Sequence, residues 1–433
     1  MPTLPVVGGT DLTPLAQLGD QVHLRADQMN LKAFIRFLKT SPLMVPVLSL
    51  IDLAIWSTDR LAVWSAGPVK VRANTLVVLK FDVLGDYLAL RNYLRYLKAH
   101  PGYSDYTFTL CGNVAFRTLA EAFDADLFAS FIWADIYKLS TQPLYRFRFV
   151  RQLRQQGFAI VFCPTHSRVL VLDDFLAKAT EAPTRIGCLG DRINLADWEA
   201  PYGNRCYSRL LPSRPGIVFE LERNRQTLEA LLNQPVPVQP ITLPASNLPA
   251  ASVEQRPFVV LSLGAGQSFR VWPANRFAAV AGYLQQHYPE FRIVLTGASG
   301  EELYAQALLH EMTDHTGVED LTGRLSLLQL ISLLSKATLL IANETGTVHL
   351  AAAVNTPTIV ISQGKSLVRW HPYPADVSSV IHYLYPADVE AHRSDLLSIA
   401  DRFNPESPLS INDIPTERVI NLLRTLLDQL AVA

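Results

Sequence analysis

The sequence predicts an α/β protein built from two Rossmann-like, doubly wound domains that face each other across a cleft, preceded by a helical N-terminal extension. Short β-branched apolar runs alternate with helical stretches, first from residue 75 and again from residue 257. A proline-rich segment separates the two series. With 433 residues the chain is too long for one ordinary domain and suits two.

The composition excludes several classes of protein. Hydrophobic residues make up 49% of the chain and charged residues 18%, which favours packed cores over disorder. The 38 Lys and Arg residues balance the 39 Asp and Glu residues, so a net charge of -1 gives no overall attraction to nucleic acid. The cysteines show neither a CxxC pair nor a ligand-like spacing with histidine, which indicates free thiols in a reducing compartment and no metal site.

Residues 1–72 are expected to form the extension, with helices between residues 30 and 66. The first residues lack the basic and apolar segments of a secretory signal, so we expect a cytoplasmic protein. Residues 41–56 are apolar but short, and contain Pro46 and Asp52, whereas a membrane-crossing helix needs about 20 apolar residues. We expect this stretch to pack on the globular body; a shallow contact with a membrane or a partner is the alternative.

The first series of strands and helices is assigned to a domain over residues 73–236. Its expected strands are residues 76–80, a strand near 108, 158–162 and 184–187, with helices near residues 87–99, 114–123 and 169–179. Arg91 and Arg95 are expected to form a solvated face of the first helix. Six prolines between residues 235 and 257 predict an extended linker, assigned to residues 237–256.

The second series is assigned to residues 257–433, which include a C-terminal helix. Its expected strands are residues 258–262, 291–295, 338–342 and 357–361, with helices beginning near Pro273, Ser326 and Thr416. In sheets of this kind ligands bind beyond the carboxyl ends of the strands. This chain places its glycine-rich and polar loops at those ends.

The most informative segment is NETGTVHLAAA, residues 343–353. A strand ends there, Gly346 makes a turn, and small residues let the next helix pack closely. Thr345, Gly346 and Thr347 therefore lie at a helix N-terminus, whose free amides favour a diphosphate. Glu344 could hold a sugar hydroxyl or orient the loop. An ordinary capped turn also explains this segment taken alone.

Two further loops favour a nucleotide. In SLGAGQSFRVWP, residues 262–273, Gly264 and Gly266 permit close approach of a ligand, and Arg270 is either a phosphate-binding fork or a surface arginine. In TGASGEE, residues 296–302, two carboxylates could accept hydrogen bonds from ribose hydroxyls, or serve only as first-turn charges of a helix.

These motifs, together with LTGRLSL at residues 321–327 and LVVLKFDVLGD at residues 76–86, resemble glycosyltransferase family 9, the heptosyltransferases, over about residues 75–373. The resemblance implies a GT-B fold, inversion at the anomeric carbon and a nucleotide-sugar donor, expected to be ADP-heptose, on the C-terminal domain. It implies a lipopolysaccharide-type or other glycan acceptor, which can be lipid-linked, on the N-terminal domain. It also implies peripheral contact with the cytoplasmic face of the inner membrane. It requires no cofactor besides the nucleotide sugar.

The resemblance also assigns roles to single residues. Asp86 matches the proposed catalytic base, and Arg270 matches the basic residue that neutralises the leaving diphosphate. Glu302 would contact ribose, and the Leu325 backbone would face adenine. The donor-binding residues that it implies are Gly264, Ala265, Gly266, Gly297, Glu302, Leu325, Glu344, Thr345, Gly346, Thr347 and His349. The acceptor candidates are Lys80, His166 and Arg168.

Three departures from the family pattern keep a second hypothesis open. Glu344 stands where the family usually has Asp, and Lys80 stands where Arg is common. The Gly264–Gly266 loop lacks a hydroxyl found in some members. A catalytically inactive relative that binds nucleotide sugar as a scaffold is therefore the alternative. A dehydrogenase is a third possibility, but no GxGxxG follows the first strand.

Overall fold

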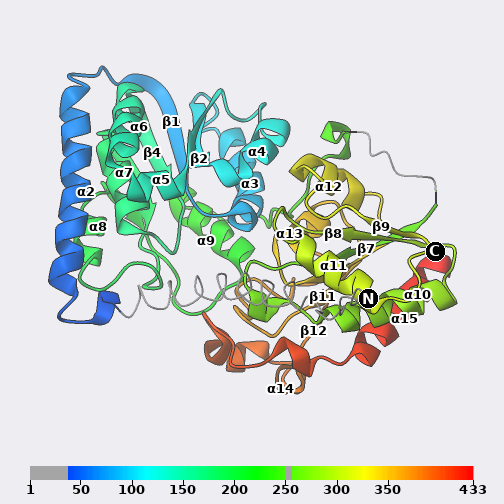
Figure 1. The fold of residues 1–433 in the computed structure, drawn as a ribbon. Helices are drawn as coiled ribbons and strands as arrows, with labels where there is room; N and C mark the ends of the chain where they lie inside the picture. Colours follow the sequence, from blue (N-terminus) through cyan, green and yellow to red (C-terminus); the bar gives the residue numbers. More distant parts are fainter. Residues whose placement is uncertain (1–37, 250–255, 433) are drawn as a thin grey trace, which may run out of the picture.

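Two parallel β-sheets form the centres of two domains (Figure 1). The computed structural model describes residues 38–249 and 256–432 of the chain. The N-terminal sheet has the order β3-β2-β1-β4-β5-β6 and the C-terminal sheet the order β12-β11-β10-β7-β8-β9. All neighbouring strands run parallel. This architecture confirms the predicted fold class.

The strands of the N-terminal sheet are β1 (Arg72–Lys80), β2 (Thr107–Asn113), β3 (Ser130–Ala134), β4 (Phe158–Cys163), β5 (Thr184–Cys188) and β6 (Arg209–Leu211). The strands of the C-terminal sheet are β7 (Phe258–Ser262), β8 (Arg292–Thr296), β9 (Val318–Asp320), β10 (Leu339–Asn343), β11 (Thr358–Ile361) and β12 (Ile381–Leu384).

The α-helices before the linker are α2 (Val45–Ser65), α3 (Leu84–Ala99), α4 (Arg117–Phe123), α5 (Ile136–Thr141), α6 (Pro143–Gln155), α7 (Phe175–Ala179), α8 (Ala200–Asn204) and α9 (Glu220–Leu232). Those after it are α10 (Ala274–His287), α11 (Glu302–Glu311), α12 (Leu327–Leu334), α13 (Gly346–Ala353), α14 (Ala387–Glu390) and α15 (Thr416–Val432).

Strand β1 shows why the sequence folds in this way. Leu76 and Val78 belong to one hydrophobic cluster, whereas Val77 and Leu79 belong to another, and all four are almost wholly buried. Because successive side chains of a strand point to opposite faces, helices must cover both faces of the sheet. An uninterrupted apolar run is what such a strand requires.

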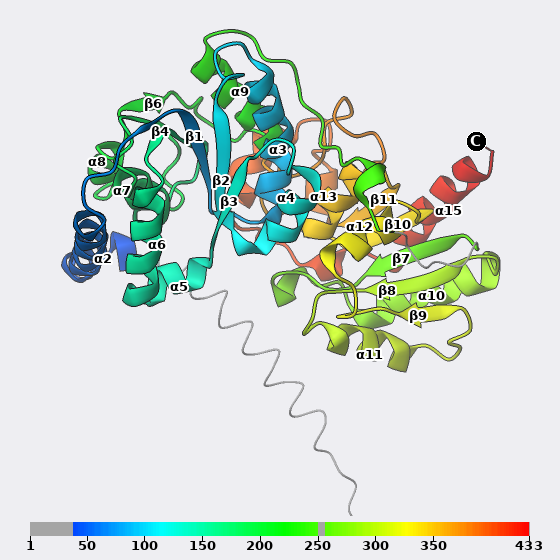
Figure 2. The same cartoon turned by 90° about the horizontal axis from the view of Figure 1, so that it is seen from above.

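The described part of the extension is mainly α2, which packs beside α6 and α7 at the outer flank of the N-terminal domain (Figure 2). Of residues 41–56, Ile55 packs partly buried against the core, whereas the buried residues of this helix, Asp59, Ala62 and Val63, follow that stretch. The expectation that residues 41–56 pack on the globular body is therefore met only in part. The predicted helical material before residue 38 lies outside the described residues. Across residues 38–249 and 256–432, the structure contains no helix with the length and apolar character that crossing a membrane requires.

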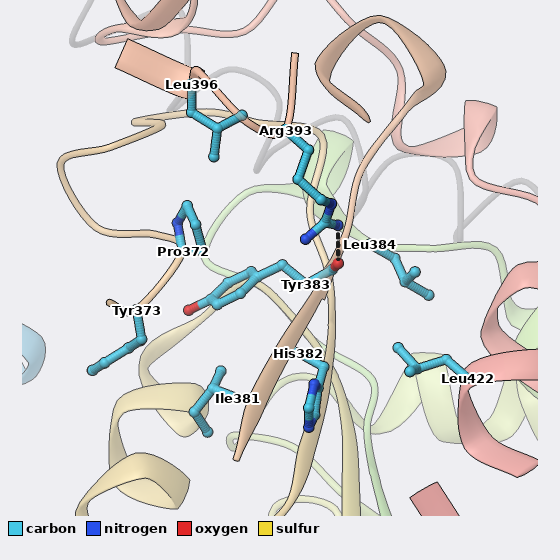
Figure 3. A pocket seen from close by; sticks show the side chains of 9 residues that line it. All are labelled: Pro372, Tyr373, Ile381, His382, Tyr383, Leu384, Arg393, Leu396 and Leu422. Carbon is cyan, nitrogen blue, oxygen red and sulfur yellow. Dashed lines mark hydrogen bonds between the residues drawn. The ribbon is translucent and has the colours of Figure 1, made fainter. Parts of the chain in front are cut away.

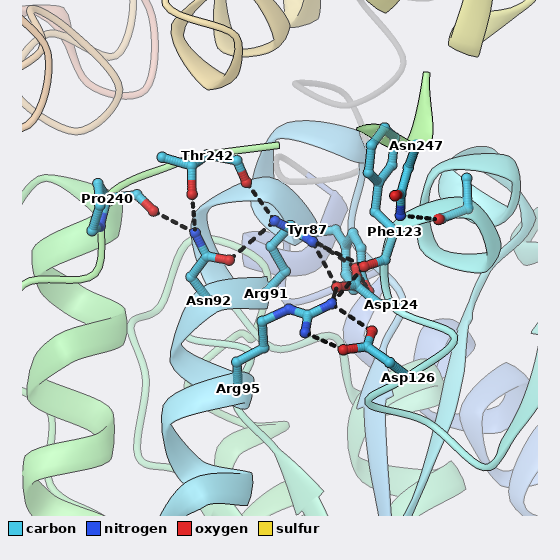
Figure 4. A network of polar contacts seen from close by, with 11 residues as sticks. Tyr87, Arg91, Asn92, Arg95, Phe123, Asp124, Asp126, Pro240, Thr242 and Asn247 are labelled. Atoms are coloured by element: carbon cyan, nitrogen blue, oxygen red, sulfur yellow. Dashed lines mark hydrogen bonds and ion pairs between the residues drawn. The ribbon is translucent and has the colours of Figure 1, made fainter. Parts of the chain in front are cut away.

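The prediction of a solvated face on α3 was wrong for Arg91 (Figure 4). This side chain is 2% exposed, and its Nη2 and Nε donate to the two carboxylate oxygens of Asp124 at 2.7 and 3.1 Å. Arg95 remains partly exposed and binds both Asp124 and Asp126. The end of α4 and the linker cover this side of α3, which the pattern of α3 alone does not reveal.

The proline-rich linker follows the surface of both domains. The side chain of Asn92 on α3 donates to the carbonyl oxygen of Pro240 at 2.5 Å (Figure 4). Three residues further along the chain, the Leu243 amide donates to the carbonyl oxygen of Ala353 in α13 at 2.8 Å. The linker is thus anchored to the two helices that begin at the candidate site.

Candidate active site

The helices that follow the central strands of the two sheets meet at the domain boundary. Helix α3 follows β1, and α13 follows β10. A Cβ atom at Gly85 would lie 3.0 Å from Cδ2 of His349, so glycine permits a close approach between α3 and α13. Phe219 and Tyr373 pack edge to face across the same boundary, with ring centroids 5.3 Å apart. The predicted residues Asp86 and His349 therefore lie in one region.

His349 is held as a neutral ring. Its Nδ1 lies 2.7 Å from the hydroxyl of Tyr373, and its ring packs against Trp370 at a centroid distance of 5.3 Å. Burial lowers the pKa of His349 to about 4. It can therefore act at neutral pH as a hydrogen-bonding and packing group, but not as a permanent cation.

Asn343 connects the loops of the C-terminal domain. It is buried at the end of β10, where its side-chain amide donates to the carbonyl oxygen of Leu263 at 2.7 Å and its Oδ1 accepts from the Trp272 amide at 3.0 Å. These bonds hold the residue 264–266 loop and the segment carrying Arg270 beside β10. Sequence reasoning gave Asn343 no role of its own, although a polar residue closing an apolar strand was the available signal.

Arg270 and Glu344 form an ion pair just before α13. Nη2 of Arg270 lies 2.6 Å from Oε1 of Glu344 and also donates to the Glu344 carbonyl oxygen. Within the described chain, the buried Nε of Arg270 and the buried Oε2 of Glu344 have no hydrogen-bond partner. Oε2 of Glu344 lies 3.5 Å from Nε2 of His371. The structure thus brings these two predicted residues together at one helix start.

The N-terminus of α13 carries the Thr345–Gly346–Thr347 turn. Thr345 is the N-cap in extended conformation, and its side chain makes no capping hydrogen bond. A Cβ atom built on Gly346 or on Gly266 would meet nothing within 4 Å. Packing therefore does not explain glycine at these two positions, whereas close approach of a ligand to the backbone would.

The two carboxylates of the loop after β8 fold back onto backbone groups. A Cβ atom at Gly264 would lie 2.0 Å from Oε2 of Glu301, and one at Gly323 would lie 2.3 Å from Oε1 of Glu302. Each carboxylate also accepts a loop N–H, at 2.7 Å for Glu301 and 2.8 Å for Glu302. Glu301, which sequence reasoning did not select, is thus the carboxylate that covers the Gly264 loop. The other predicted donor residues here are buried or half-buried: Ala265, Gly297 and Leu325.

Asp86 stands in the first turn of α3 in an acidic environment. Burial, and next the neighbouring Asp82 carboxylate, raise the pKa of Asp86 to about 8, with Glu220 adding to the shift. Lys80 and Arg369 act in the opposite direction. The N-cap of α3 is Val83, and it makes no side-chain capping bond. A carboxyl group with this pKa can exchange a proton near neutral pH.

Lys80 lies beside this carboxyl group at the end of β1. It is 2% exposed, and its Nζ is 2.6 Å from Oδ2 of Asp82. Burial opposes its charged form, but Asp82, Asp86 and Glu220 outweigh burial and raise the pKa of Lys80. Oδ2 of Asp82 also accepts from the Thr165 hydroxyl at 3.2 Å. Lys80 is therefore a permanent cation that compensates a group of acids, rather than an exposed acceptor contact.

His166 and Arg168 have different partners in the structure. Nε2 of His166 lies 2.8 Å from Nη1 of Arg223, and burial followed by this arginine lowers the pKa of His166 to about 4. Arg168 is 1% exposed, and its Nη1 lies 2.6 Å from Oδ1 of the buried Asp174. The acceptor role expected for Arg168 is corrected here to a structural one, because its charge is used inside the N-terminal domain.

Arg369 is a bridging residue that sequence reasoning missed. It comes from the loop after β11, and its Nη2 donates to the Ser167 hydroxyl of the other domain at 2.9 Å. Its Nε lies 3.4 Å from Oε2 of Glu220, and its carbonyl oxygen accepts the Glu220 amide at 2.9 Å. Its Nη1 lies 3.9 Å from Asp191. The sequence around this single loop arginine does not reveal these contacts, because they depend on how the two domains are arranged.

A hollow of about 450 Å³ lies elsewhere, at the edge strand β12 (Figure 3). Tyr383 and His382 line it, and the guanidinium of Arg393 closes one side by donating to the Tyr383 carbonyl oxygen at 2.6 Å. None of the predicted donor or acceptor residues lines this hollow. The hollow therefore lies outside the candidate site, although Tyr373 borders both. The described residues also include no cluster of three or more His, Cys, Asp or Glu side chains suited to a metal ion.

The sequence profile of Glycosyltransferase family 9 (heptosyltransferase) matches residues 146–397. Lipopolysaccharide heptosyltransferase 3 of Escherichia coli is 28% identical over 185 residues, which are 40% of this chain and 53% of that protein. The chain thus matches about half the length of this curated relative.

Two solved structures have the same fold. A family 9 glycosyltransferase from Veillonella parvula superposes with a TM-score of 0.62 at 18% identity. The superposition covers 83% of this chain and 99% of the Veillonella chain. The E. coli heptosyltransferase WaaC with ADP superposes with a TM-score of 0.60 at 16% identity, covering 81% and 99%.

Proposed function

This chain belongs to glycosyltransferase family 9, and we propose that it is an inverting glycosyltransferase that moves a sugar from a nucleotide sugar to a glycan acceptor. The C-terminal domain would hold the donor and the N-terminal domain the acceptor. The proposed donor is ADP-heptose, because the relative WaaC was solved with ADP and the loops around α13 suit a nucleoside diphosphate. The proposed acceptor is a lipopolysaccharide-type, lipid-linked glycan, as the name of the E. coli relative suggests.

The observation that carries this proposal is the close approach of α3 and α13. A Cβ atom added to Gly85 would lie only 3.0 Å from Cδ2 of His349. This approach puts Asp86, the next residue on α3, beside the helix whose N-terminus suits a diphosphate. A carboxylate from one domain then faces the reactive end of a donor held by the other. Such an arrangement is what a displacement at the anomeric carbon requires.

In the proposed reaction, the Asp86 carboxylate removes the proton of an acceptor hydroxyl. The hydroxyl oxygen forms a bond to the anomeric carbon from the face opposite the diphosphate, and the bond from that carbon to the diphosphate oxygen breaks. The electron pair leaves with the diphosphate. Arg270 and the first amides of α13 would stabilise this negative charge, and a single displacement inverts the anomeric configuration.

A scaffold that binds nucleotide sugar without transferring it is the second candidate. The observation that favours it is the ion pair of Arg270 with Glu344 at 2.6 Å. The Glu344 carboxylate neutralises the guanidinium group that is proposed to bind the diphosphate. At this position the family usually has Asp, whose side chain is shorter than that of Glu344. The two candidates differ in turnover, not in donor binding.

The test is an incubation of the full-length protein with ADP-heptose and truncated lipopolysaccharide, with ADP release and product mass measured together. UDP-, GDP- and CMP-linked sugars are the matched controls for the base. We expect acceptor-dependent ADP release and a product whose anomeric configuration is opposite to the donor's by NMR. Donor binding without product would favour the scaffold, and a retained configuration would contradict the mechanism.

A further inference from the structure

The outward side of α2 is largely apolar, with Arg60 as an exposed charged residue of the helix. Leu50, Leu61 and Trp64 are 66%, 58% and 81% exposed, although residues of these types are ordinarily buried. Four more large apolar residues of this helix are also exposed: Val47, Ile51, Leu53 and Trp56. Contiguous exposed apolar surface on this scale marks a site of interaction.

The orientation of α2 is fixed by its other side. Asp59 is buried there, and Arg146 of α6 donates to its two carboxylate oxygens at 2.7 and 2.6 Å. Ala62 and Val63 join the core on the same side. Turning the apolar side inward would break a buried ion pair, so the exposed side is the permanent outer surface of this domain.

A groove of about 690 Å³ runs beside the helix. Leu53 and Trp56 of α2 line one wall, and Phe175 and Tyr202 are among the residues opposite. Asp52 is the acidic side chain in its lining, and burial followed by Glu199 raises the pKa of that carboxyl group to about 6. The groove therefore extends the apolar surface into the body of the domain.

Helix α6, which packs beside α2, carries several cations. Residues 136–155, which include α5 and α6 beside α2, contain five cations and no Asp or Glu. Three of these cations form ion pairs: Lys138 with Asp135, Arg146 with Asp59 and Arg154 with Glu181. The other two on α6, Arg148 and Arg151, are exposed, and among the described residues neither has an ion-pair partner. Lys178 and Arg205 line the groove. An apolar strip beside unpaired arginines is complementary to a membrane surface with anionic lipids.

We propose that the outer side of α2, with the groove and the exposed arginines of α6, docks the enzyme on an anionic lipid bilayer. The apolar side chains enter the interface between headgroups and acyl chains, and the guanidinium groups contact lipid phosphates. The inference rests on the proposed function in one respect, since docking would bring a lipid-linked acceptor near the site. Helix α2 itself precedes residue 146, where the match to the family profile begins.

The test uses co-sedimentation of the full-length protein with vesicles of phosphatidylethanolamine and phosphatidylglycerol, and with vesicles of phosphatidylcholine alone. We expect binding to the anionic vesicles that weakens with salt. The double variant Leu50→Gln, Leu61→Gln should partition about tenfold less, and Arg148→Gln with Arg151→Gln should lose about fivefold for each cation removed. Leu397→Gln is the matched control, because Leu397 is 62% exposed on the C-terminal domain and should leave binding unchanged.

Failure of the wild-type protein to bind anionic vesicles would overturn the proposal, whatever else covers the helix. So would a dimer, measured by light scattering, that the two leucine substitutions convert to a monomer without any vesicle binding. ADP affinity by calorimetry separates this result from the proposed function: the α2 variants should bind ADP like the wild type. Vesicle binding by a protein that does not bind ADP would support the docking surface and contradict the proposed glycosyltransferase function.

Discussion

At the scale of single residues, the site depends on how one carboxyl group is tuned. Asp86 has two acidic neighbours, Asp82 and Glu220, and two cationic ones, Lys80 and Arg369. A pKa of about 8 leaves this group mainly protonated at neutral pH, so a base mechanism gains speed as the pH rises. The surrounding charges should therefore set the pH dependence of the reaction.

For the wild type, kcat/KM should rise with pH through a pKa of about 8, because the deprotonated Asp86 is the active form. Asp82→Asn removes a negative neighbour, which lowers the pKa of Asp86 and moves the rise to lower pH. Asp126→Asn, a change to an exposed carboxylate that pairs with Arg95, is the control and should leave the curve in place. Superimposable curves for all three proteins would show that Asp86 does not control the rate.

Arg270 offers a second prediction at this scale. Arg270→Ala should weaken ADP binding by about tenfold to a hundredfold, since charge-assisted hydrogen bonds contribute about 1.5–3 kcal/mol each. Calorimetry measures the affinity, and Arg256→Ala, which removes an exposed arginine bonded to the Pro289 carbonyl oxygen, is the control. Unchanged ADP affinity in Arg270→Ala would reduce this residue to the structural partner of Glu344.

Among single residues, the sequence identifies those inside a motif and misses those that act across a distance. Arg270 and Glu344 stand in glycine-rich loops, and the structure places them together. Arg369 has no such context, because its importance comes from neighbours in the other domain. Asp82 stands in the residue 76–86 motif, but its effect on the pKa of Asp86 depends on how that loop folds. Arg168 was misjudged for the same reason: its partner Asp174 follows in a helical stretch whose direction the sequence does not show.

At the scale of elements, long apolar runs are predictable and short edge strands are not. The central strands β1, β4, β7, β8, β10 and β11 coincide with predicted runs. The edge strands β3, β6, β9 and β12 were not predicted. They are short, and pairing with a neighbour rather than local composition makes them strands. The capping box of α12, formed by Ser326 and Gln329, shows how well a local end signal works when it exists.

Arg168 also yields a prediction for its elements, since it joins the loop after β4 to α7 and α8. Nη1 binds Asp174, and Nη2 donates to the Asn204 side chain at 2.7 Å. Arg168→Ala leaves Asp174 buried without its cation, which should lower the free energy of unfolding by about 3–5 kcal/mol. Urea denaturation measures this, with Arg192→Ala, a largely exposed ion pair with Asp197, as control. A raised acceptor KM at unchanged stability would restore the acceptor role.

At the scale of the whole molecule, function depends on how the two domains are held. The fold of each domain follows from its apolar runs, but the contacts between domains come from loops. Arg369 reaches Ser167 across the boundary at 2.9 Å, and Gly85 adjoins His349. These contacts join residues more than 200 positions apart, which explains why the sequence predicts the donor loops better than the acceptor side.

Arg369→Ala should therefore lower turnover by about tenfold while ADP affinity stays near that of the wild type, because the donor loops remain intact. The loss of a cation also raises the pKa of Asp86, so the pH profile should move upward, opposite to the shift in Asp82→Asn. Arg369→Lys should restore part of the pH profile. Weakened ADP binding with an unmoved profile would indicate that Arg369 supports only the C-terminal loops.

The central claim is that Asp86, on the N-terminal domain, is the base for a donor held by the C-terminal domain. The most direct measurement is turnover of Asp86→Asn with truncated lipopolysaccharide, alongside its ADP affinity. Asn keeps the shape but cannot accept the proton, so turnover should fall by about 10²–10⁴ while ADP affinity remains near that of the wild type. Equal turnover in the two proteins would contradict the account and leave Asp86 as an ordinary first-turn residue of α3.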